Sequence, residues 1–295
     1  MGEAKRRKIA PCICGTGLPG EQCCWTPTGY HKKPAVIDLH DTGLQSSHDG
    51  CYMRRTNACD LKLSGEHLVS EGVLKVLADE RVELSGTPWL EGQKKILPFT
   101  ALTSNCLCTR HNSRLSPIDV VGANFFSAIQ KCGTTDRGRG MYFLLSGHDV
   151  ERWMLRSLAV FGVSKNFAID GAVIDQEFID RLRIIELLEK PRAWQQPVGF
   201  YLVRGLGHQF WRRENVQLAP IVKAGGDTVM GITLDIQGLE FALLAAEHDI
   251  NGTGLDRALY RPGAFVFNMA GVEHRIQISW EDGGCHEDVI ITWKP

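Results

Sequence analysis

The sequence contains no apolar run that could cross a membrane, since no stretch approaches the roughly eighteen consecutive hydrophobic residues that a spanning helix requires. The first residues, from Met1 to Lys8, lead to Cys12 without the apolar segment of a secretion signal. We therefore expect a soluble protein that stays in the cytoplasm and does not bind membranes.

An excess of charge of either sign is also missing. The 295 residues include 33 basic and 34 acidic ones, which gives a formal net charge of −1. Proteins that bind nucleic acid through a broad electrostatic field are strongly basic, so any such contact must use a local surface here. The candidates for such a local basic surface are Lys5 to Lys8, Arg54 with Arg55, and Arg110 with Arg114. For each of them the alternative is an ordinary charged surface in contact with solvent.

Several sequence motifs of common enzymes are absent. The chain has no Gly-x-Ser-x-Gly elbow, no phosphate-binding loop and no dinucleotide fingerprint. It also shows no internal repeat of about 20–50 residues. These absences exclude the common serine hydrolases, kinases and dehydrogenases, and they exclude solenoids and propellers.

Cysteine is plentiful: eight of the ten cysteines precede residue 109. The adjacent Cys23 and Cys24, and the closely spaced Cys12 and Cys14, have poor geometry for bonding to each other. A reducing compartment also disfavours disulfides and leaves thiolates as zinc ligands. Cys132 and Cys285 stand apart from the clusters, and we expect both to be buried thiols.

The first cluster consists of Cys12, Cys14, Cys23 and Cys24, the ligand number of a closed zinc site. The surrounding segment has no periodic apolar pattern and needs a metal to fold. Its run Cys-Ile-Cys-Gly-Thr-Gly followed by Cys-Cys resembles the SEC-C motif, a small zinc-binding module. This resemblance implies a module that binds a protein partner; zinc used only for folding remains the alternative.

The second cluster combines cysteines with other polar residues. Cys51 and Cys59 precede Glu66 and His67, and the stretch from Asn105 to Asn112 contains Cys106, Cys108 and His111. This pattern resembles HNH endonucleases of the subgroup with C…C, then E-H-I-x-P, then L-C-x-x-C-N. Glu66 stands where Asp is commoner, and Ser70 stands near the expected Pro.

The HNH resemblance implies two kinds of metal site. Cys51, Cys59, Cys108 and His111 would bind a structural zinc ion, with Cys106 as an alternative to Cys108. Glu66 and Asn112 would hold Mg²⁺ or Mn²⁺, because oxygen ligands suit hard cations. His67 corresponds to the general base that takes a proton from water, and Asn105 corresponds to the residue that holds the base-bearing loop.

We predict an α+β protein in three parts. They are a zinc module at 1–30, a treble-clef ββα-metal domain at 48–133 and, after a Gly/Arg/Asp-rich linker, a mainly antiparallel β domain with helices at 141–295. Hydrophobic periodicity and capping residues predict helices at 70–77, 116–133 (with Ser116 as cap and Pro117 at the first position), 149–162 and 175–190. Strands are predicted at 36–40, 81–84, 95–100, 198–203, 216–221, 228–234, 264–268, 276–280 and 289–293.

The sequence thus predicts a metal-dependent HNH-type endonuclease with two structural zinc ions. Its partner would be nucleic acid, with DNA favoured over RNA. The rival hypothesis is a zinc adaptor without catalysis that binds nucleic acid or protein. The adaptor would need the eight zinc ligands but not Glu66, His67 or Asn112.

Overall fold

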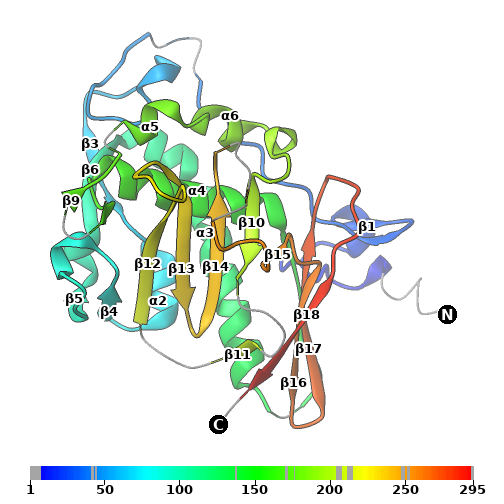
Figure 1. The fold of residues 1–295 in the computed structure, drawn as a ribbon. Coiled ribbons are helices and arrows are strands. Elements are labelled where there is room, and N and C mark those ends of the chain that lie inside the picture. The colour runs from blue at the N-terminus through cyan, green and yellow to red at the C-terminus, as the bar shows by residue number, and fades with distance from the viewer. Residues whose placement is uncertain are drawn as a thin grey trace.

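The computed structural model describes residues 8–293 apart from 41–42, 44, 137, 170–171, 176, 204–207, 211–214, 247–249 and 251–252. Helices pack against two larger sheets, so the predicted α+β class is confirmed (Figure 1). The small N-terminal segment, drawn in blue, lies beside the second sheet, where its Cys12 and Cys24 pack against Leu144.

The larger layer is a seven-stranded sheet. In spatial order it contains β15 (Leu259–Tyr260), β10 (Gly199–Leu202), β14 (Leu239–Leu244), β13 (Val229–Ile236), β12 (Asn215–Val222), β4 (Arg81–Ser85) and β5 (Lys95–Pro98). Neighbours are antiparallel except β12 and β4, which run parallel. In β12, Val216 and Leu218 are buried while Gln217 between them is exposed, the alternation of a strand with one face on the core.

The second sheet has five strands. In order they are β11 (His208–Phe210), β18 (Asp288–Trp293), β16 (Ala264–Met269), β17 (Val272–Ser279) and β7 (Tyr142–Ser146). Only β16 and β17 pair antiparallel, as a hairpin, and the other neighbours run parallel. Mainly antiparallel pairing was predicted for residues 141–295 as a whole. It is found in the strands that these residues contribute to the seven-stranded sheet, but not in this second sheet. Its parallel neighbours are joined by long connections, and the direction of pairing across such connections cannot be predicted from the spacing of hydrophobic residues.

Two further strands form a separate antiparallel pair that leads into a long helix. In this pair β3 (Leu63–His67) lies against β6 (Thr103–Cys108), with His67 opposite Thr103. The helix α3 (Thr109–Thr134) follows β6 directly. Between the strands the chain forms α2 (Glu71–Leu77), β4, η3 (Pro88–Leu90), β5 and η4 (Phe99–Leu102).

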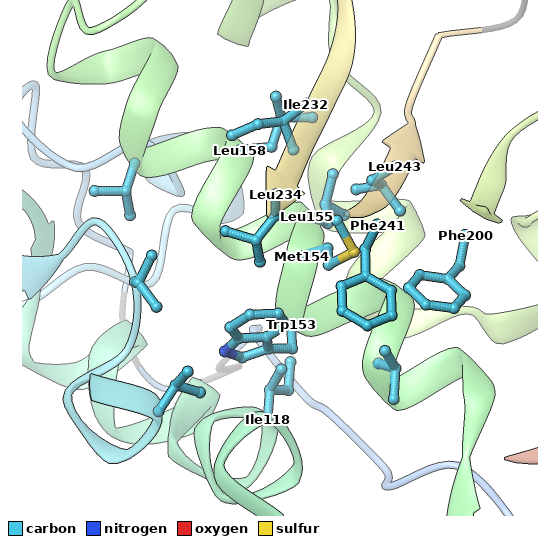
Figure 2. Packing of buried hydrophobic residues seen from close by; sticks show 14 of the residues in the cluster. Ile118, Trp153, Met154, Leu155, Leu158, Phe200, Ile232, Leu234, Phe241 and Leu243 are labelled. Carbon is cyan, nitrogen blue, oxygen red and sulfur yellow. The ribbon is translucent and has the colours of Figure 1, made fainter. Parts of the chain in front are cut away.

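The core lies where α3 and α4 (Gly147–Val163) cover the seven-stranded sheet (Figures 1 and 2). Phe125 of α3 reaches both sheets, with ring centroids 5.6 Å from Phe241 of β14 and 5.7 Å from Phe265 of β16. The two helices meet closely at Gly122, where a Cβ atom would lie 2.4 Å from Trp153 Nε1. Only glycine fits this crossing without a shift of the indole ring.

The helix predicted to begin at Ser116 begins earlier, at Thr109, with Cys108 as its N-cap. Pro117 lies inside α3, although proline lacks the N–H group that would bind the carbonyl of Ser113. Ser116 Oγ donates a hydrogen bond to that carbonyl at 2.9 Å. The freed acceptor is thereby satisfied, which explains why the helix continues through the proline.

Three other local predictions were wrong. The cap of α4 is Ser146, whose Oγ accepts a hydrogen bond from Asp149 N at 3.3 Å, so Asp149 lies within the first turn. The predicted helix at 175–190 is two short helices, α5 (Phe178–Arg181) and α6 (Ile184–Glu189), because the backbone is extended at the buried Leu182. The segment 36–40 forms no strand; Leu39 N instead donates to Glu189 Oε1 at 2.9 Å.

The predicted second and third parts share both a sheet and a core. Asn215 of β12 pairs with Glu83 of β4, and one hydrophobic cluster includes residues from both sides of the predicted linker. The division at 134–140 as a domain boundary stays a prediction.

The remaining elements are η1 (Gly20–Gln22), β1 (Trp25–Thr26), β2 (Gly29–Tyr30), η2 (Arg54–Thr56), β8 (Ala168–Ile169), β9 (Ala172–Val173) and η5 (Pro191–Ala193). Among the described residues, no helix has the length and apolar character needed to span a bilayer.

Candidate metal centres and the polar cluster beside them

The four N-terminal cysteines converge as predicted. Possible ligand atoms of Cys12, Cys14, Cys23 and Cys24 all lie within 4.8 Å of one another. Gly15, with a φ of 82°, allows the tight turn after the first pair. Cys12 and Cys24 are buried, whereas Cys23 is exposed. This group of ligands is therefore open to solvent on one side.

The Thr16 hydroxyl supports the thiolate form of Cys14. It lies 3.4 Å from Cys14 Sγ and 3.2 Å from Cys23 Sγ. Burial raises the pKa of Cys14, but hydrogen bonds from Thr16 and the neighbouring cysteines outweigh burial and lower that pKa to about 6. Because the thiolate is the form that binds metal, Cys14 is suited to a cation, whereas burial raises the pKa of Cys12 and of Cys24.

The second group joins four residues from separate parts of the chain. Possible ligand atoms of Cys51, Cys59, Cys108 and His111 lie within 4.8 Å of one another, and all four residues are buried. His111 Nδ1 lies 3.0 Å from Cys108 Sγ, 3.6 Å from Cys51 Sγ and 3.8 Å from Cys59 Sγ. Cys108 ends β6 and His111 lies in the first turn of α3, so the strand-to-helix junction places both.

Sequence reasoning missed the residues that orient His111. Its Nε2 lies 3.0 Å from Thr56 Oγ1 and 3.1 Å from the carbonyl oxygen of Leu39. Burial lowers the pKa of His111, while the Leu39 carbonyl opposes this shift. A neutral ring that donates through Nε2 leaves Nδ1 free to bind a metal. A backbone carbonyl has no sequence signature, so only the structure identifies Leu39.

Each group offers four soft or imidazole ligands, a set consistent with zinc. Cys106, the alternative to Cys108, lies outside both groups; burial raises its pKa to about 12. Cys132 is buried, as predicted. Cys285 is exposed, so the prediction of a buried thiol there was wrong; it follows Gly283 and Gly284 in a surface loop between β17 and β18.

Glu66 and Asn112, which the HNH resemblance assigns to one ion, converge on a third residue. Glu66 is buried on β3, and its Oε1 forms an ion pair with Arg156 Nη2 of α4. The same Nη2 atom lies 3.5 Å from Asn112 Oδ1. Asn112 is held by its own amide, which donates to Ser64 Oγ at 3.1 Å. The fold thus brings the two predicted oxygen ligands to one place.

Asp119 belongs to the same cluster, and sequence reasoning missed it. Its Oδ1 pairs with Arg156 Nη1. Asp119 follows Asn112 by two turns of α3, and this spacing is the signal that could have placed both on one helix face. Burial lowers the pKa of Arg156 to about 10, an effect that the neighbouring Tyr52 opposes. We call Glu66, Asn112, Asp119 and Arg156 the Arg156 cluster.

His67 and Asn105 lie around this cluster rather than in it. His67 follows Glu66 on β3, so the two side chains point to opposite faces of the strand. Burial lowers the pKa of His67; Glu71 opposes that shift and Lys75 adds to it. Asn105 is exposed on β6, and its Oδ1 would lie 3.9 Å from a Cβ placed on Gly65, directly before Glu66. The neutral imidazole is therefore favoured, and Asn105 borders the strand that carries it.

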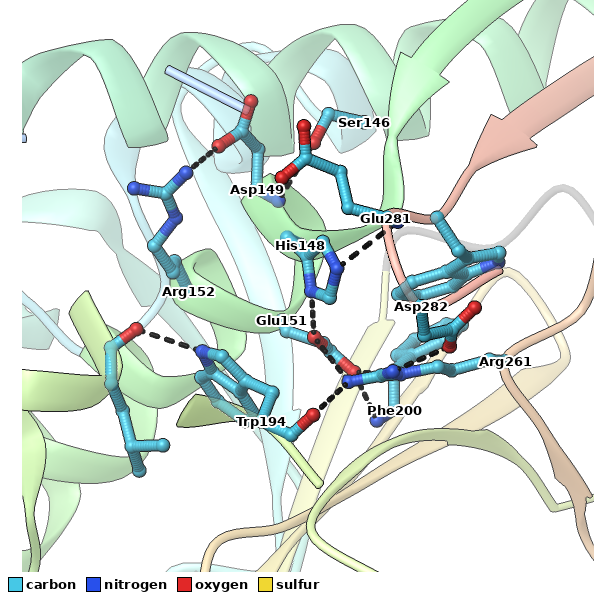
Figure 3. Close-up of polar contacts among 12 residues, drawn as sticks. Ser146, His148, Asp149, Glu151, Arg152, Trp194, Phe200, Arg261, Glu281 and Asp282 are labelled. Atoms are coloured by element: carbon cyan, nitrogen blue, oxygen red, sulfur yellow. Dashed lines mark hydrogen bonds and ion pairs between the residues drawn. The ribbon is translucent and has the colours of Figure 1, made fainter. Parts of the chain in front are cut away.

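A second buried polar network fixes the first turns of α4 (Figure 3). His148 Nδ1 lies 2.9 Å from Glu151 Oε2, and Arg261 Nε donates to Glu151 Oε1 at 2.8 Å. Arg261 Nη1 also donates to Asp282 Oδ2 at 2.6 Å. Burial alone would lower the pKa of Arg261, but the charge of Glu151, the neighbouring Tyr260 and the hydrogen bonds to Glu151 and Asp282 together outweigh burial and raise that pKa. These paired groups connect α4 to the second sheet.

A cavity of about 390 Å³ lies beside the second metal-type group. Arg54 and Arg55, a predicted basic surface, line it and both pair with Asp180 Oδ1, at 3.0 Å and 3.1 Å. Three acidic residues, Asp180, Glu186 and Glu189, line the same cavity, so its walls are mixed in charge.

Of the predicted basic run from Lys5 to Lys8, residues 5–7 lie outside the described residues.

Comparison of the chain with protein-family models, with curated proteins and with solved structures gives no match. Function is therefore inferred from the residues and their geometry.

Proposed function

We propose that this protein is a metal-dependent endonuclease of the HNH type that hydrolyses phosphodiester bonds, with DNA as the favoured substrate. The observation that carries the proposal is the convergence of Glu66 and Asn112 on one nitrogen of Arg156, beside the buried group of three cysteines and His111. Glu66 comes from β3 and Asn112 from α3, so only the folded chain brings them together.

The order of elements also supports a treble-clef ββα unit. Cys51 and Cys59 precede β3, the strands β3 and β6 are antiparallel, and α3 follows with His111 in its first turn. A zinc ion held by these ligands would pin both ends of the unit. A zinc ion in the first group would stabilise a SEC-C-like module that binds a protein partner.

The donor chemistry of the Arg156 cluster fits a hard divalent cation. Glu66 and Asn112 present oxygen atoms, and the buried Oε2 of Glu66 has no hydrogen-bond partner among the described residues. When bound, Mg²⁺ or Mn²⁺ would stabilise negative charge on the phosphate and the leaving oxygen. The HNH resemblance assigns His67 the role of the neutral base that takes the proton of the attacking water, and it assigns Asn105 the support of the end of β3. The position of His67 on the face of β3 opposite Glu66 is the observation that weighs against this role.

A second candidate function is a zinc adaptor that binds nucleic acid or protein without catalysis. The observation that favours it is the burial of Glu66, whose Oε1 already forms an ion pair with Arg156. In that hypothesis Glu66 and Arg156 only stabilise the contact between β3 and α4.

A cleavage assay with His67→Ala separates the two functions. Plasmid DNA, single-stranded DNA and RNA are incubated with the protein and Mg²⁺ or Mn²⁺. We expect the native chain to cut and His67→Ala to lose at least about a hundredfold in rate, the usual contribution of a general base. His40→Ala is the matched control, because the side chain of His40 is exposed and its Nε2 lies 3.5 Å from Glu189 Oε2.

Both variants should keep two zinc ions per chain and the native circular dichroism spectrum. A native chain that cuts none of the substrates, or a His67→Ala variant that cuts as fast as His40→Ala, would favour the adaptor. Loss of zinc in His67→Ala would show that His67 belongs to a structural zinc site.

A further inference from the structure

The Arg156 cluster contains more negative than positive charge. Glu66 and Asp119 both pair with Arg156, and among the residues that the structure describes no other basic side chain pairs with either acid. The side chains of Glu66 and Arg156 are 2% and 6% exposed. Two carboxylates against one guanidinium leave a net charge of −1 in a place with little access to water, which is unfavourable.

A divalent cation that takes the place of the Arg156 guanidinium would remove this imbalance. Its two positive charges equal the two negative charges of Glu66 and Asp119, whereas an ion bound beside the guanidinium would leave a net charge of +1. The amide oxygen of Asn112 adds a neutral ligand. Glu66 Oε2, which has no hydrogen-bond partner in the part of the chain that the structure describes, is available to such an ion. The side chain of Asp119 is 25% exposed, so an ion could enter from the side of α3.

We propose that the Arg156 cluster is a divalent-cation site in which Asp119 is a ligand together with Glu66 and Asn112, and in which Arg156 holds these ligands together until the ion replaces its guanidinium. Arg156 is thus a positioning residue that competes with the ion. The inference rests on the proposed function in assigning the ion to Glu66 and Asn112, and it adds Asp119 and the competition by Arg156.

Direct binding of Mn²⁺ tests this site without any cleavage. The full-length, zinc-loaded protein is titrated with Mn²⁺ to millimolar concentration, and the loss of the electron paramagnetic resonance signal of free Mn²⁺ gives the affinity. We expect one saturable site in the native chain. Asp119→Asn should weaken binding by about tenfold or more, because it removes a charged ligand. Arg156→Gln should strengthen binding by about tenfold or more, because it removes the competing charge.

Matched controls lie on the exposed pair at the cavity. Asp180→Asn and Arg54→Gln make the same chemical changes in an ion pair whose side chains are 46% and 37% exposed. Neither should change the affinity for Mn²⁺. Because Arg156→Gln leaves two carboxylates unpaired, it should also be less stable than native without Mn²⁺ and regain melting temperature when Mn²⁺ is added.

The outcomes separate this inference from the nuclease proposal. If the native chain cuts nothing but Asp119→Asn weakens Mn²⁺ binding and Asp180→Asn does not, the cation site stands and the nuclease proposal falls. If the native chain cuts but Asp119→Asn binds Mn²⁺ as tightly as native, the inference is overturned and the nuclease proposal stands. Absence of saturable binding by the native chain also overturns it. Should Arg156→Gln fail to fold with or without Mn²⁺, the native and Asp119→Asn titrations decide.

Discussion

Charged residues inside the protein are the least expected feature at the scale of single residues. The helix α4 buries Asp149, Glu151, Arg152 and Arg156. Arg152 Nη2 donates to Asp149 Oδ1 at 2.6 Å, and Glu151 binds Arg261 of a distant segment. In a sequence, charged residues of this kind indicate a face exposed to solvent. Burial of their charges is possible here because each is paired with an opposite charge or a hydrogen-bond partner.

The pair of Glu151 and Arg261 gives a prediction at this scale. Arg261→Met should lower the free energy of unfolding by about 3 kcal/mol or more, because it removes the guanidinium that pairs with the buried carboxylate of Glu151. Arg275→Met is the control, since Arg275 pairs with Asp288 at 2.6 Å with side chains 28% and 43% exposed. That change should cost no more than about 1 kcal/mol. Urea denaturation measures both, and equal losses would contradict the assignment of Arg261 as a buried structural ion.

At the scale of elements, the sequence predicted most clearly what depends on short-range spacing. All eight expected metal ligands fall into the two groups that the fold assembles, because each group contains ligand pairs that lie close together in the chain. Strands β4, β12 and β16 were predicted from their apolar pattern and are confirmed. Hydrophobic spacing also predicted the apolar residues Trp153 and Leu158 of α4, which are buried, but it did not predict that α4 is buried on all sides from Gly147 to Phe161.

Features that depend on contacts across the chain were not predictable in this way. The start of α3 was missed because Ser116 and Pro117 are a helix-start signal whose effect is cancelled by the hydrogen bond from Ser116 to Ser113. Arg156 and Asp119 were missed because their significance lies in meeting Glu66 in space. The parallel pairing of β7 with β17 likewise has no local signature.

The crossing of α3 and α4 gives a prediction at the element scale. In an open helix, Gly→Ala stabilises by about 1 kcal/mol. At Gly122 the added methyl group would lie 2.4 Å from Trp153 Nε1, and that nitrogen is fixed by a hydrogen bond to Ser70 Oγ at 2.9 Å. We therefore expect Gly122→Ala to destabilise the protein by about 1–3 kcal/mol through overpacking.

Gly226→Ala is the control for this change, since its Cβ would meet its nearest atom at 3.8 Å. Its effect on stability should stay within about 0.5 kcal/mol. Thermal and urea denaturation measure both variants. A Gly122→Ala protein more stable than native would show that the helices are not in close contact there.

At the scale of the whole molecule, the two metal-type groups differ in how the rest of the chain encloses them. The first contacts the body through Leu144 of β7 and leaves Cys23 exposed. In the second, Cys51, Cys59 and Cys108 belong to the main hydrophobic core, and His111 is 0% exposed. A metal in the first group can therefore be reached from solvent, whereas the second is accessible only when the core opens.

This difference predicts that zinc leaves the protein in two stages. The purified chain should contain two zinc ions, and a strong chelator should remove the first while the near-ultraviolet circular dichroism of the core stays unchanged. The second should leave only as that signal is lost, because structural zinc and folding are coupled. Both events are measured by recording the signal of a colorimetric zinc indicator and the circular dichroism of the same sample.

Cys23→Ser should lack the early stage and keep a folded core, whereas Cys108→Ser should unfold the region around β3, β6 and α3. Simultaneous release of both ions, or loss of the core signal in Cys23→Ser, would show that the first group is as deeply integrated into the fold as the second.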